Sequence, residues 1–232
     1  MSLPTPAYVI GDDQRETVYE PAEDTFLLLD ALEKEATLLR ERDVNVIVEV
    51  GCGSGVVSTF AVQLLDRPVC ALATDVNFAA LQCTKHTAKL NRVDVDTVMC
   101  DLLSALSPRL RGLVDVLLFN PPYVPTMTPA TDDASRCWAG GPSGRETLDR
   151  LLKEAPDLLS SNGLIYVVAL KANNIPQLLE HSQLLKGSVV LERRCDARGD
   201  RRAHSLCTVQ GFSQNKRTTG FPVWDYPVVY HQ

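Results

Sequence analysis

Short apolar runs alternate along this chain with longer stretches in which apolar residues recur every three or four positions. Short apolar runs predict buried strands, and the helical spacing predicts helices with one apolar face. The alternation of the two is typical of an α/β fold with a largely parallel sheet. Strands are predicted over residues 46–50, 69–74, 96–100, 114–119, 164–170, 188–192 and 205–212, and helices over 26–39, 56–65, 77–91, 146–159 and 174–185.

A glycine-rich loop follows the first predicted strand. Gly51, Gly53 and Gly55 lie between that strand and the next helix. In such a loop the backbone can approach a ligand closely, and the helix amino end offers N–H donors. The dinucleotide fingerprint needs its third glycine three residues after the second, but Val56 occupies that position. The loop therefore favours S-adenosyl-L-methionine over a nicotinamide dinucleotide.

Acidic residues end three successive predicted strands, namely Glu49, Asp75 and Asp101. Each acid taken alone is better interpreted as an ordinary N-cap of the following helix. Asp75, however, lies about 20 residues after the glycine loop, where an acid can accept hydrogen bonds from ribose hydroxyls. Asp101 is placed to reach an adenine amino group. The three acids beside the glycine loop together favour a cofactor site.

The tetrapeptide Asn120-Pro121-Pro122-Tyr123 follows the strand predicted over 114–119. Open α/β sheets bind ligands outside the carboxyl ends of their strands. The Asn120 side-chain oxygen and the Pro121 carbonyl could each accept one hydrogen of a planar NH2 group, and Tyr123 could stack on that group. Such a motif would aim a weakly nucleophilic nitrogen at an electrophile. By itself, the tetrapeptide fits a simple turn about equally well.

These motifs carry a family resemblance that runs from about residue 19 to residue 212. The chain resembles the HemK-type protein glutamine methyltransferases, in the eukaryotic and archaeal form that acts on the class I peptide-chain release factor. The matching stretches are residues 19–25, 49–55, 74–75, 101–102, 119–123 and 138–141. The resemblance implies a Rossmann-like, seven-stranded class I methyltransferase fold, with residues 19–42 as a helical cover.

The resemblance also implies which residues act. Asn120, Pro121, Pro122 and Tyr123 would be catalytic, and Asn120, Pro121 and Tyr123 would hold the glutamine of the Gly-Gly-Gln motif in the release factor. A small zinc-binding activator subunit, shared with transfer-RNA methyltransferases, would complete a heterodimer. The residues implied to bind S-adenosyl-L-methionine are Thr25, Glu49, Gly51, Gly53, Gly55, Asp75, Asp101, Leu102 and Asn120.

Other targets stay open at this point. The adenine amino group of DNA presents the same planar nitrogen, but reaching it requires base extraction and a target-reading element, for which the chain has no spare domain. A protein lysine lacks the planar group that the tetrapeptide suits. A cofactor-binding scaffold without activity is the alternative from another class, and the intact tetrapeptide argues against it.

Composition sets wider limits. The length of 232 residues and the 45% hydrophobic content fit one domain over residues 1–212 and an aromatic-rich tail over 213–232. The seven cysteines and four histidines show no metal-ligand spacing, so we expect free thiols and no metal site. A net charge of −6 disfavours nonspecific nucleic-acid binding. Without an apolar run of about 18 residues or a signal peptide, a cytoplasmic location is expected, with the nucleus as a second location and no membrane association.

Three segments have no clear element. Residues 124–143 form a long loop rich in Pro, Thr, Asp and Gly, which we expect to cover the substrate because it follows the tetrapeptide directly. Basic residues gather between Arg193 and Arg217, where a solvated hairpin loop is favoured over a recognition patch. The tail is expected to pack on the domain, with a docking peptide as the alternative.

Overall fold

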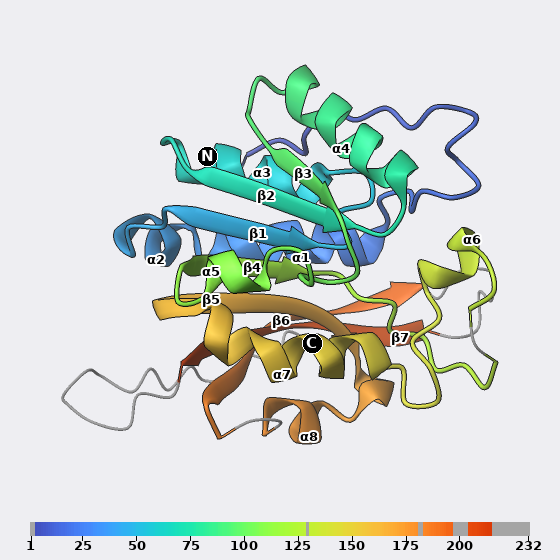
Figure 1. Cartoon of the computed structure of the whole chain (residues 1–232). Coiled ribbons are helices and arrows are strands. Elements are labelled where there is room, and N and C mark those ends of the chain that lie inside the picture. The colour runs from blue at the N-terminus through green and yellow to red at the C-terminus, as the bar shows by residue number, and fades with distance from the viewer. Residues whose placement is uncertain (1–2, 129, 181–182, 197–203, 215–232) are drawn as a thin grey trace.

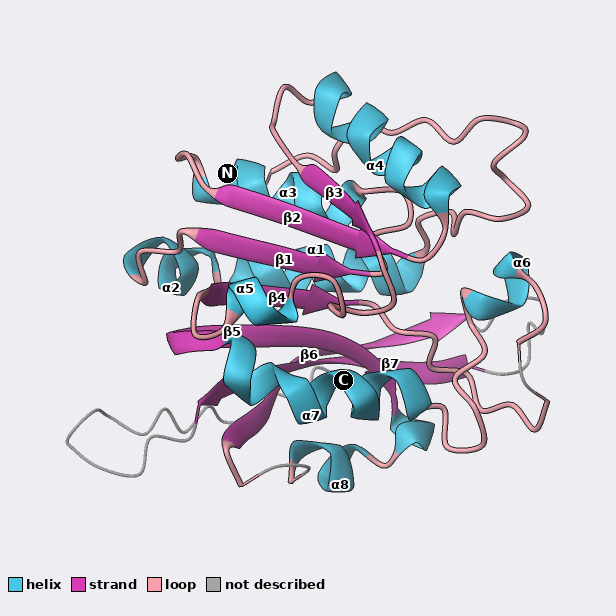
Figure 2. Cartoon of the chain, viewed as in Figure 1, coloured by secondary structure: helices cyan, strands magenta, loops and turns pink. Residues whose placement is uncertain are grey.

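The computed structural model describes residues 3–128, 130–180, 183–196 and 204–214. Figure 1 follows the chain by colour, and Figure 2 separates helices from strands. In chain order the elements are α1 (Glu23–Lys34), α2 (Ala36–Glu41), β1 (Val46–Val50), α3 (Val56–Leu65), β2 (Cys70–Asp75), α4 (Phe78–Leu90), β3 (Asp96–Met99), α5 (Ser107–Leu110), β4 (Val114–Phe119), α6 (Asp133–Arg136), α7 (Glu146–Leu158), β5 (Leu159–Leu170), the 3-10 turn η1 (Lys171–Asn173), α8 (Ile175–Leu179), β6 (Leu185–Asp196) and β7 (His204–Gln214).

The strands form one seven-stranded sheet in the order β3-β2-β1-β4-β5-β7-β6. Strands β1 to β5 pair in parallel, and β7 runs antiparallel to both of its neighbours. The strand order reverses between β1 and β4, because the chain builds β2 and β3 on one side of β1 and then crosses to the other side. The predicted seven-stranded α/β fold is confirmed, and the reversal marks the place where such sheets bind ligands.

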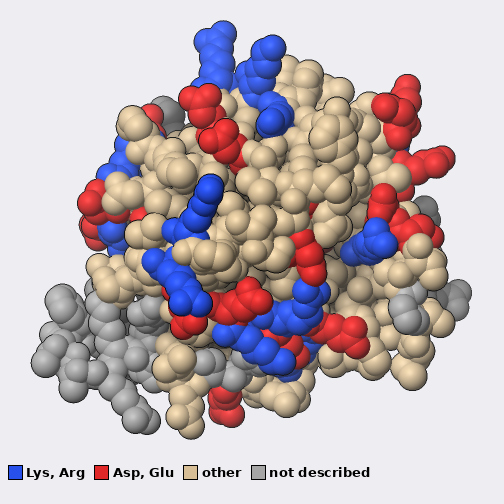
Figure 3. All heavy atoms as spheres, viewed as in Figure 1, with Lys and Arg blue, Asp and Glu red and all other residues tan. Residues whose placement is uncertain are grey.

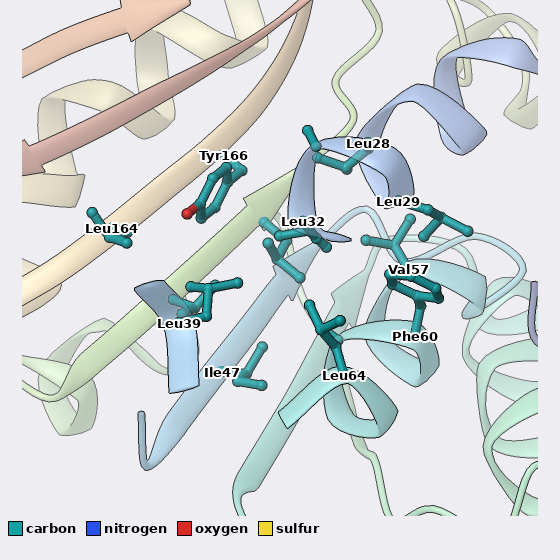
Figure 4. Close-up of a cluster of buried hydrophobic side chains, with 14 of the residues drawn as sticks. Leu28, Leu29, Leu32, Leu39, Ile47, Val57, Phe60, Leu64, Leu164 and Tyr166 are labelled. Carbon is teal, nitrogen blue, oxygen red and sulfur yellow. The ribbon is translucent and has the colours of Figure 1, made fainter. Parts of the chain in front are cut away.

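Helices cover both faces of the sheet. In Figure 1, α5, α7 and α8 lie in front of it, and α1 and α3 lie behind it. Figure 4 shows one core cluster on the rear face, where Leu28 and Leu32 of α1 meet Phe60 and Leu64 of α3 over Ile47 of β1. These five side chains are at most 2% exposed, and burial of each contributes about 1.5–3 kcal/mol. This packing holds α1 across the sheet, with its first turn at the carboxyl ends of the strands.

The single helix predicted over 26–39 is wrong in one respect, because the helix breaks at Glu35. This residue has φ −99° and ψ 13°, and α1 ends before it while α2 begins after it. The Glu35 carboxylate accepts a hydrogen bond from the hydroxyl of Tyr166, whose side chain is 1% exposed. A buried hydroxyl without a partner would be costly, so a tertiary contact overrides the local helical pattern.

The strand predicted over 164–170 begins earlier in the structure, since β5 runs without interruption from Leu159. The register between β4 and β5 shifts there, with Val114 opposite Leu159 and Val116 opposite Leu164. The extra residues form a bulge rather than a turn. A Cβ atom on Gly163 would lie 2.6 Å from the Val114 carbonyl oxygen, so only glycine fits this close approach of two backbones.

The C-terminal elements differ from their predicted bounds. Helix α8 ends at Leu179 rather than Leu185, which is already the first residue of β6. Strands β6 and β7 form a hairpin, as predicted, and both are longer than expected. Ser213 and Gln214, which the sequence placed in the tail, are the last residues of β7. The loop residues 197–203 and the rest of the tail lie outside the described residues.

The surface shows no dominant charge on the face seen in Figure 3. Lys and Arg side chains lie among Asp and Glu side chains over this face. No helix in the described part of the chain is both long enough and apolar enough to cross a membrane.

Candidate active site

A cavity of about 1470 Å³ lies at the carboxyl ends of the parallel strands. Typical sites for one small molecule measure about 300–1,000 Å³, so this cavity has room for a cofactor and for a substrate side chain beside it. The predicted site residues that line it are Thr25, Glu49, Gly51, Gly53, Asp75, Asp101, Leu102, Asn120, Pro121, Pro122 and Tyr123. Gly55 does not line it.

The three glycines of the loop have different roles. All adopt left-handed backbone conformations, with φ of 65° at Gly51, 49° at Gly53 and 76° at Gly55. A Cβ atom on Gly55 would lie 2.5 Å from Cα of Thr84, so this glycine lets the amino end of α3 pack directly on α4. Gly51 and Gly53 face the cavity, where the bare backbone gives a ligand close access.

Glu49 is held at the base of the cavity by the first turn of α3. Its carboxylate accepts hydrogen bonds from the Ser58 backbone N–H at 2.9 Å and from the Ser58 hydroxyl. The residue is only 3% exposed, and this burial raises the pKa of its carboxyl to about 8, against the opposing hydrogen bonds from Ser58. The nearby charge of Asp75 raises the pKa further. A cation placed beside Glu49 would favour the ionised form.

Asp75 is fixed by backbone donors at the end of β2. One carboxylate oxygen accepts from the Gly53 N–H at 3.1 Å, and the other accepts from the Asn77 N–H at 2.9 Å. Burial raises the pKa of Asp75, and these hydrogen bonds oppose the rise. Each carboxylate oxygen has a second lone pair, so Asp75 can still accept from a hydroxyl in the cavity.

Asp101 lies at the rim of the cavity. It forms an ion pair with Arg150 of α7 at 2.5 Å, and both side chains are 55% exposed. An exposed pair of this kind contributes about 0–1 kcal/mol and can open readily, so Asp101 stays available to a ligand. The next residue, Leu102, is buried in a left-handed conformation with φ 50°, and its carbonyl accepts from the Thr74 hydroxyl at 2.8 Å.

The Asn120 side chain is anchored at its nitrogen, whereas its oxygen has no described partner. Its Nδ2 donates to Oδ2 of Asp24 at 3.1 Å. The Tyr123 hydroxyl donates to the same oxygen at 2.7 Å. Asn120 Oδ1 is buried and has no hydrogen-bond partner among the described residues. A buried acceptor without a donor is costly, so a ligand N–H or O–H fits this position.

The backbone of the tetrapeptide is braced from behind by Asn173. This buried side chain donates from Nδ2 to the carbonyls of Tyr123 at 2.9 Å and Ser143 at 3.1 Å, and its Oδ1 accepts from the Leu170 N–H at 2.7 Å. A Cβ atom on Gly144 would lie 2.3 Å from the Tyr123 carbonyl oxygen. The contacts leave the tetrapeptide little freedom to shift.

The loop after the tetrapeptide folds back on itself. Its two arms are joined by hydrogen bonds from Val124 N–H to the Trp138 carbonyl at 3.0 Å, and from the Gly140 N–H to the Val124 carbonyl at 2.8 Å. Gly140 lies so close to the tetrapeptide that a Cβ atom on it would be 2.5 Å from the Pro122 carbonyl oxygen. Met127 and Trp138 line the cavity while 88% and 45% exposed. The predicted covering loop thus forms one wall of the cavity mouth.

The cavity wall is strongly acidic. Among the described residues that line it, seven carry a carboxyl group and two carry a guanidinium. An acidic wall favours a cationic ligand such as a sulfonium. The acids are Glu23, Asp24, Glu49, Asp75, Asp101, Asp133 and Glu146, and the basic residues are Arg136 and Arg150. No group of three or more His, Cys, Asp or Glu residues in the described ranges is arranged to hold a metal ion.

Sequence reasoning missed two residues of this site. Asp24 is not among the predicted site residues, although it lies in residues 19–25, one of the stretches that carry the family resemblance. Asn173 was not singled out, and no local signal marks it, because its partners are 50 and 30 residues away along the chain.

Together, the reversed strand order, the glycine loop, the acidic strand ends and the open Asn120 amide define a class I S-adenosylmethionine-dependent methyltransferase. The model of the methyltransferase small domain family matches residues 22–193. The chain therefore belongs to this family, and within it to the HEMK2 methyltransferases, as its relatives show.

Three relatives and one solved structure illustrate the similarity. Methyltransferase HEMK2 of Mus musculus is 46% identical over 200 residues, covering 83% of this chain and 92% of the relative. The eRF1 methyltransferase catalytic subunit mtq2 of Schizosaccharomyces pombe is 38% identical, covering 70% and 77%. The release factor glutamine methyltransferase of Aquifex aeolicus is 31% identical, covering 70% and 61%. Precorrin-6y C5,15-methyltransferase of Geobacter metallireducens shares the fold, with a TM-score of 0.55 at 16% identity, covering 88% and 96%.

Proposed function

We propose that this chain methylates the side-chain amide nitrogen of a glutamine in a class I release factor, at the Gly-Gly-Gln motif, and that it does so as the catalytic subunit of a heterodimer. The names of two relatives support the substrate, since one is a methyltransferase of eRF1 and another a release factor glutamine methyltransferase. The first is also named a catalytic subunit, which supports a second subunit.

The observation that carries the proposal is the missing hydrogen-bond partner of Asn120 Oδ1. Its Oδ1 is buried without a described partner, while Nδ2 is anchored on Asp24. This arrangement presents an acceptor to the substrate. The NH2 of a glutamine has two hydrogens in one plane, and Pro121, which also lines the cavity, would supply its carbonyl as the second acceptor. Holding both hydrogens turns the nitrogen lone pair toward the cofactor.

The chain's own groups act mainly by orientation. S-adenosyl-L-methionine supplies an electrophilic methyl group on a positively charged sulfur. Asn120 and Pro121 hold the amide in plane, and Tyr123 packs beside it. Orientation of this kind can lower a barrier by several kcal/mol without a strong general base. The acidic wall favours the cationic cofactor over the product, which has lost the sulfonium charge.

The same geometry ranks the competing targets. A lysine ammonium is tetrahedral and charged, so two acceptors in one plane do not match its three donors. Adenine has the planar amino group, but the cavity wall carries seven carboxyl groups against two guanidinium groups, and this balance disfavours nucleic-acid phosphates. An inactive scaffold would leave the buried Asn120 acceptor without a purpose.

The mass of purified release factor after incubation with S-adenosyl-L-methionine tests this proposal. With the activator subunit present, the wild-type chain should add one methyl group to the glutamine of the Gly-Gly-Gln motif. Asn120→Ala should lose nearly all turnover while still folding, as judged by its melting temperature. A methyl group on lysine, on DNA, or on no tested substrate would reject the proposal.

The edge of the sheet offers a place for the activator. Strand β3 is one of the two outer strands, and large exposed apolar side chains lie at its carboxyl end, in the turn after the neighbouring β2 and at the start of α4. Met99 is 62% exposed, Phe78 60% and Val76 45%. Unpaired edge strands with exposed apolar residues readily add a strand from another chain. We place the zinc-binding activator subunit on this edge.

Co-purification of the two subunits tests that placement. Phe78→Glu should abolish capture of the activator, because it puts a charge in the apolar contact. Leu113→Glu is the matched control, since Leu113 is 52% exposed and lies before β4, away from this edge. Equal capture by both variants would show that the activator binds elsewhere.

A further inference from the structure

Asp24 is a buried carboxylate that joins the first turn of α1 to the catalytic tetrapeptide. The residue is 4% exposed. Its Oδ2 accepts from Asn120 Nδ2 at 3.1 Å and from the Tyr123 hydroxyl at 2.7 Å. The Tyr19 hydroxyl lies 2.9 Å from both oxygens, and the Thr25 N–H donates to Oδ1 at 2.8 Å. Every polar partner of this carboxylate is a donor.

That fact decides which way the Asn120 amide points. The oxygen and nitrogen of an asparagine amide have nearly the same size, so packing alone does not distinguish the two orientations. A carboxylate accepts and cannot donate. The reversed amide would bring its oxygen against Asp24 Oδ2 at about the same separation, with no hydrogen between the two acceptors. Asp24 therefore turns Nδ2 toward itself and leaves Oδ1, which is buried without a described partner, as the free acceptor of the amide.

We propose that Asp24 is a positioning residue for methyl transfer, which acts through Asn120 to keep an acceptor oxygen facing the substrate nitrogen. Tyr19 and Tyr123 hold the carboxylate in place. The inference rests on the proposed function, because it assumes that the group bound at Asn120 donates an N–H. It requires of the substrate a target nitrogen that carries a hydrogen in this direction.

The simpler explanation is that Asp24 only stabilises the start of α1, because a negative charge at a helix amino end interacts favourably with the helix dipole. Under that explanation, loss of Asp24 would lower stability, and the effect would not depend on the residue at position 120. The two explanations predict different rates of methyl transfer when the side chains at positions 24 and 120 are exchanged.

Three variants separate them, with methyl transfer to the release factor as the readout. In Asn120→Asp, two carboxylates lie about 3 Å apart, and transfer at pH 7.5 should fall by about 100-fold or more. Transfer should recover as the pH is lowered, because the pair then shares one proton and the outer oxygen of residue 120 faces the substrate again. In Asp24→Asn, residue 24 offers both a donor and an acceptor, so it no longer selects one orientation of the Asn120 amide. The value of kcat should then fall by about tenfold or more.

The double variant Asp24→Asn/Asn120→Asp reverses the hydrogen bond and restores the acceptor in the cavity. It should therefore exceed Asn120→Asp by about tenfold or more at pH 7.5 and lose the acid dependence. A double variant no better than the worse single variant would overturn the proposal. Asp30→Asn is the matched control, because Asp30 lies on the same helix in an exposed ion pair with Arg193. This control should retain wild-type turnover.

A second readout needs no substrate. The Asn120 NH2 resonances, identified by their absence in Asn120→Ala, should exchange slowly in the wild-type chain and about tenfold or more faster in Asp24→Ala. If the release factor is not methylated but exchange follows this pattern, the proposed function fails while the Asp24 anchor stands. If the release factor is methylated but neither exchange nor the swap behaves as stated, the positioning role is wrong.

Discussion

Replacement of Gly144 by alanine should damage both stability and activity, because this glycine lies against the backbone of the catalytic tetrapeptide. Its φ is +67°, and a Cβ atom there would lie 2.3 Å from the Tyr123 carbonyl oxygen and 2.4 Å from Nδ2 of Asn173. The left-handed conformation costs alanine about 1–2 kcal/mol, and overpacking adds about 1–3 kcal/mol. The expected loss is about 2–5 kcal/mol in the free energy of unfolding.

Gly112 provides a matched control with the same backbone strain. Its φ is +68°, and no atom lies within 4 Å of the position of its Cβ. Gly112→Ala should therefore lose only the conformational part, about 1–2 kcal/mol. For a chain of this size, 1 kcal/mol corresponds to about 2–4 °C in melting temperature. Gly144→Ala should melt about 2–12 °C below Gly112→Ala, which reflects the clash alone.

Calorimetric unfolding and methyl transfer to the release factor measure the two effects. Relief of the clash pushes the Tyr123 carbonyl, so Gly144→Ala should also lose turnover, by as much as about 100-fold for a shift near 1 Å. Gly112→Ala should keep wild-type turnover. Equal melting temperatures and equal turnover of the two variants would show that the close approach at Gly144 has no consequence.

Three further predictions concern other contacts. Glu49 has its pKa raised from its ordinary value of 4.5 to about 8, so its neutral form stabilises the fold. That stability is complete below pH 4.5 and is lost as the pH rises toward 8, by about 1.4 kcal/mol per pH unit. The melting temperature should fall more steeply between pH 5 and 9 for the wild type than for Glu49→Gln, and equal slopes would contradict this. Asn173→Ala should cost about 1–3 kcal/mol in urea unfolding and reduce kcat, whereas loss of stability alone would limit Asn173 to a structural role. Asn91→Ala removes the hydrogen bonds that hold Ala7 at 3.0 and 2.7 Å, and trypsin should then cleave faster after Arg15; an unchanged rate would show that Asn91 does not hold this segment.

Local pattern predicted most of the elements correctly where the physical signal is short in range. Strands β1, β2 and β4 coincide closely with apolar runs, and α3 coincides with the helix predicted after the glycine loop. The errors come from distant partners. The helix break at Glu35 follows from Tyr166, 131 residues away, and the bulge at Gly163 follows from the backbone of β4.

The candidate site divides in the same way. Glycines, acidic strand ends and the tetrapeptide are recognisable because turns and strand ends demand particular residue types nearby. The individual role of each of these residues cannot be recognised from the sequence in the same way. Only the packing of α3 on α4 shows that Gly55 is a spacer outside the cavity, and only the ion pair with Arg150 shows that Asp101 lies at the rim.

By itself, the sequence determined the class of fold, the place of the cavity and the residues around it, because periodicity and turn chemistry act over a few residues. The tertiary structure alone decided which way the Asn120 amide faces. Asp24 lies 96 residues from Asn120 and 99 from Tyr123 along the chain. The hydrogen bonds between them exist only after α1 packs across the sheet, and a contact at that separation has no local pattern from which it could be predicted.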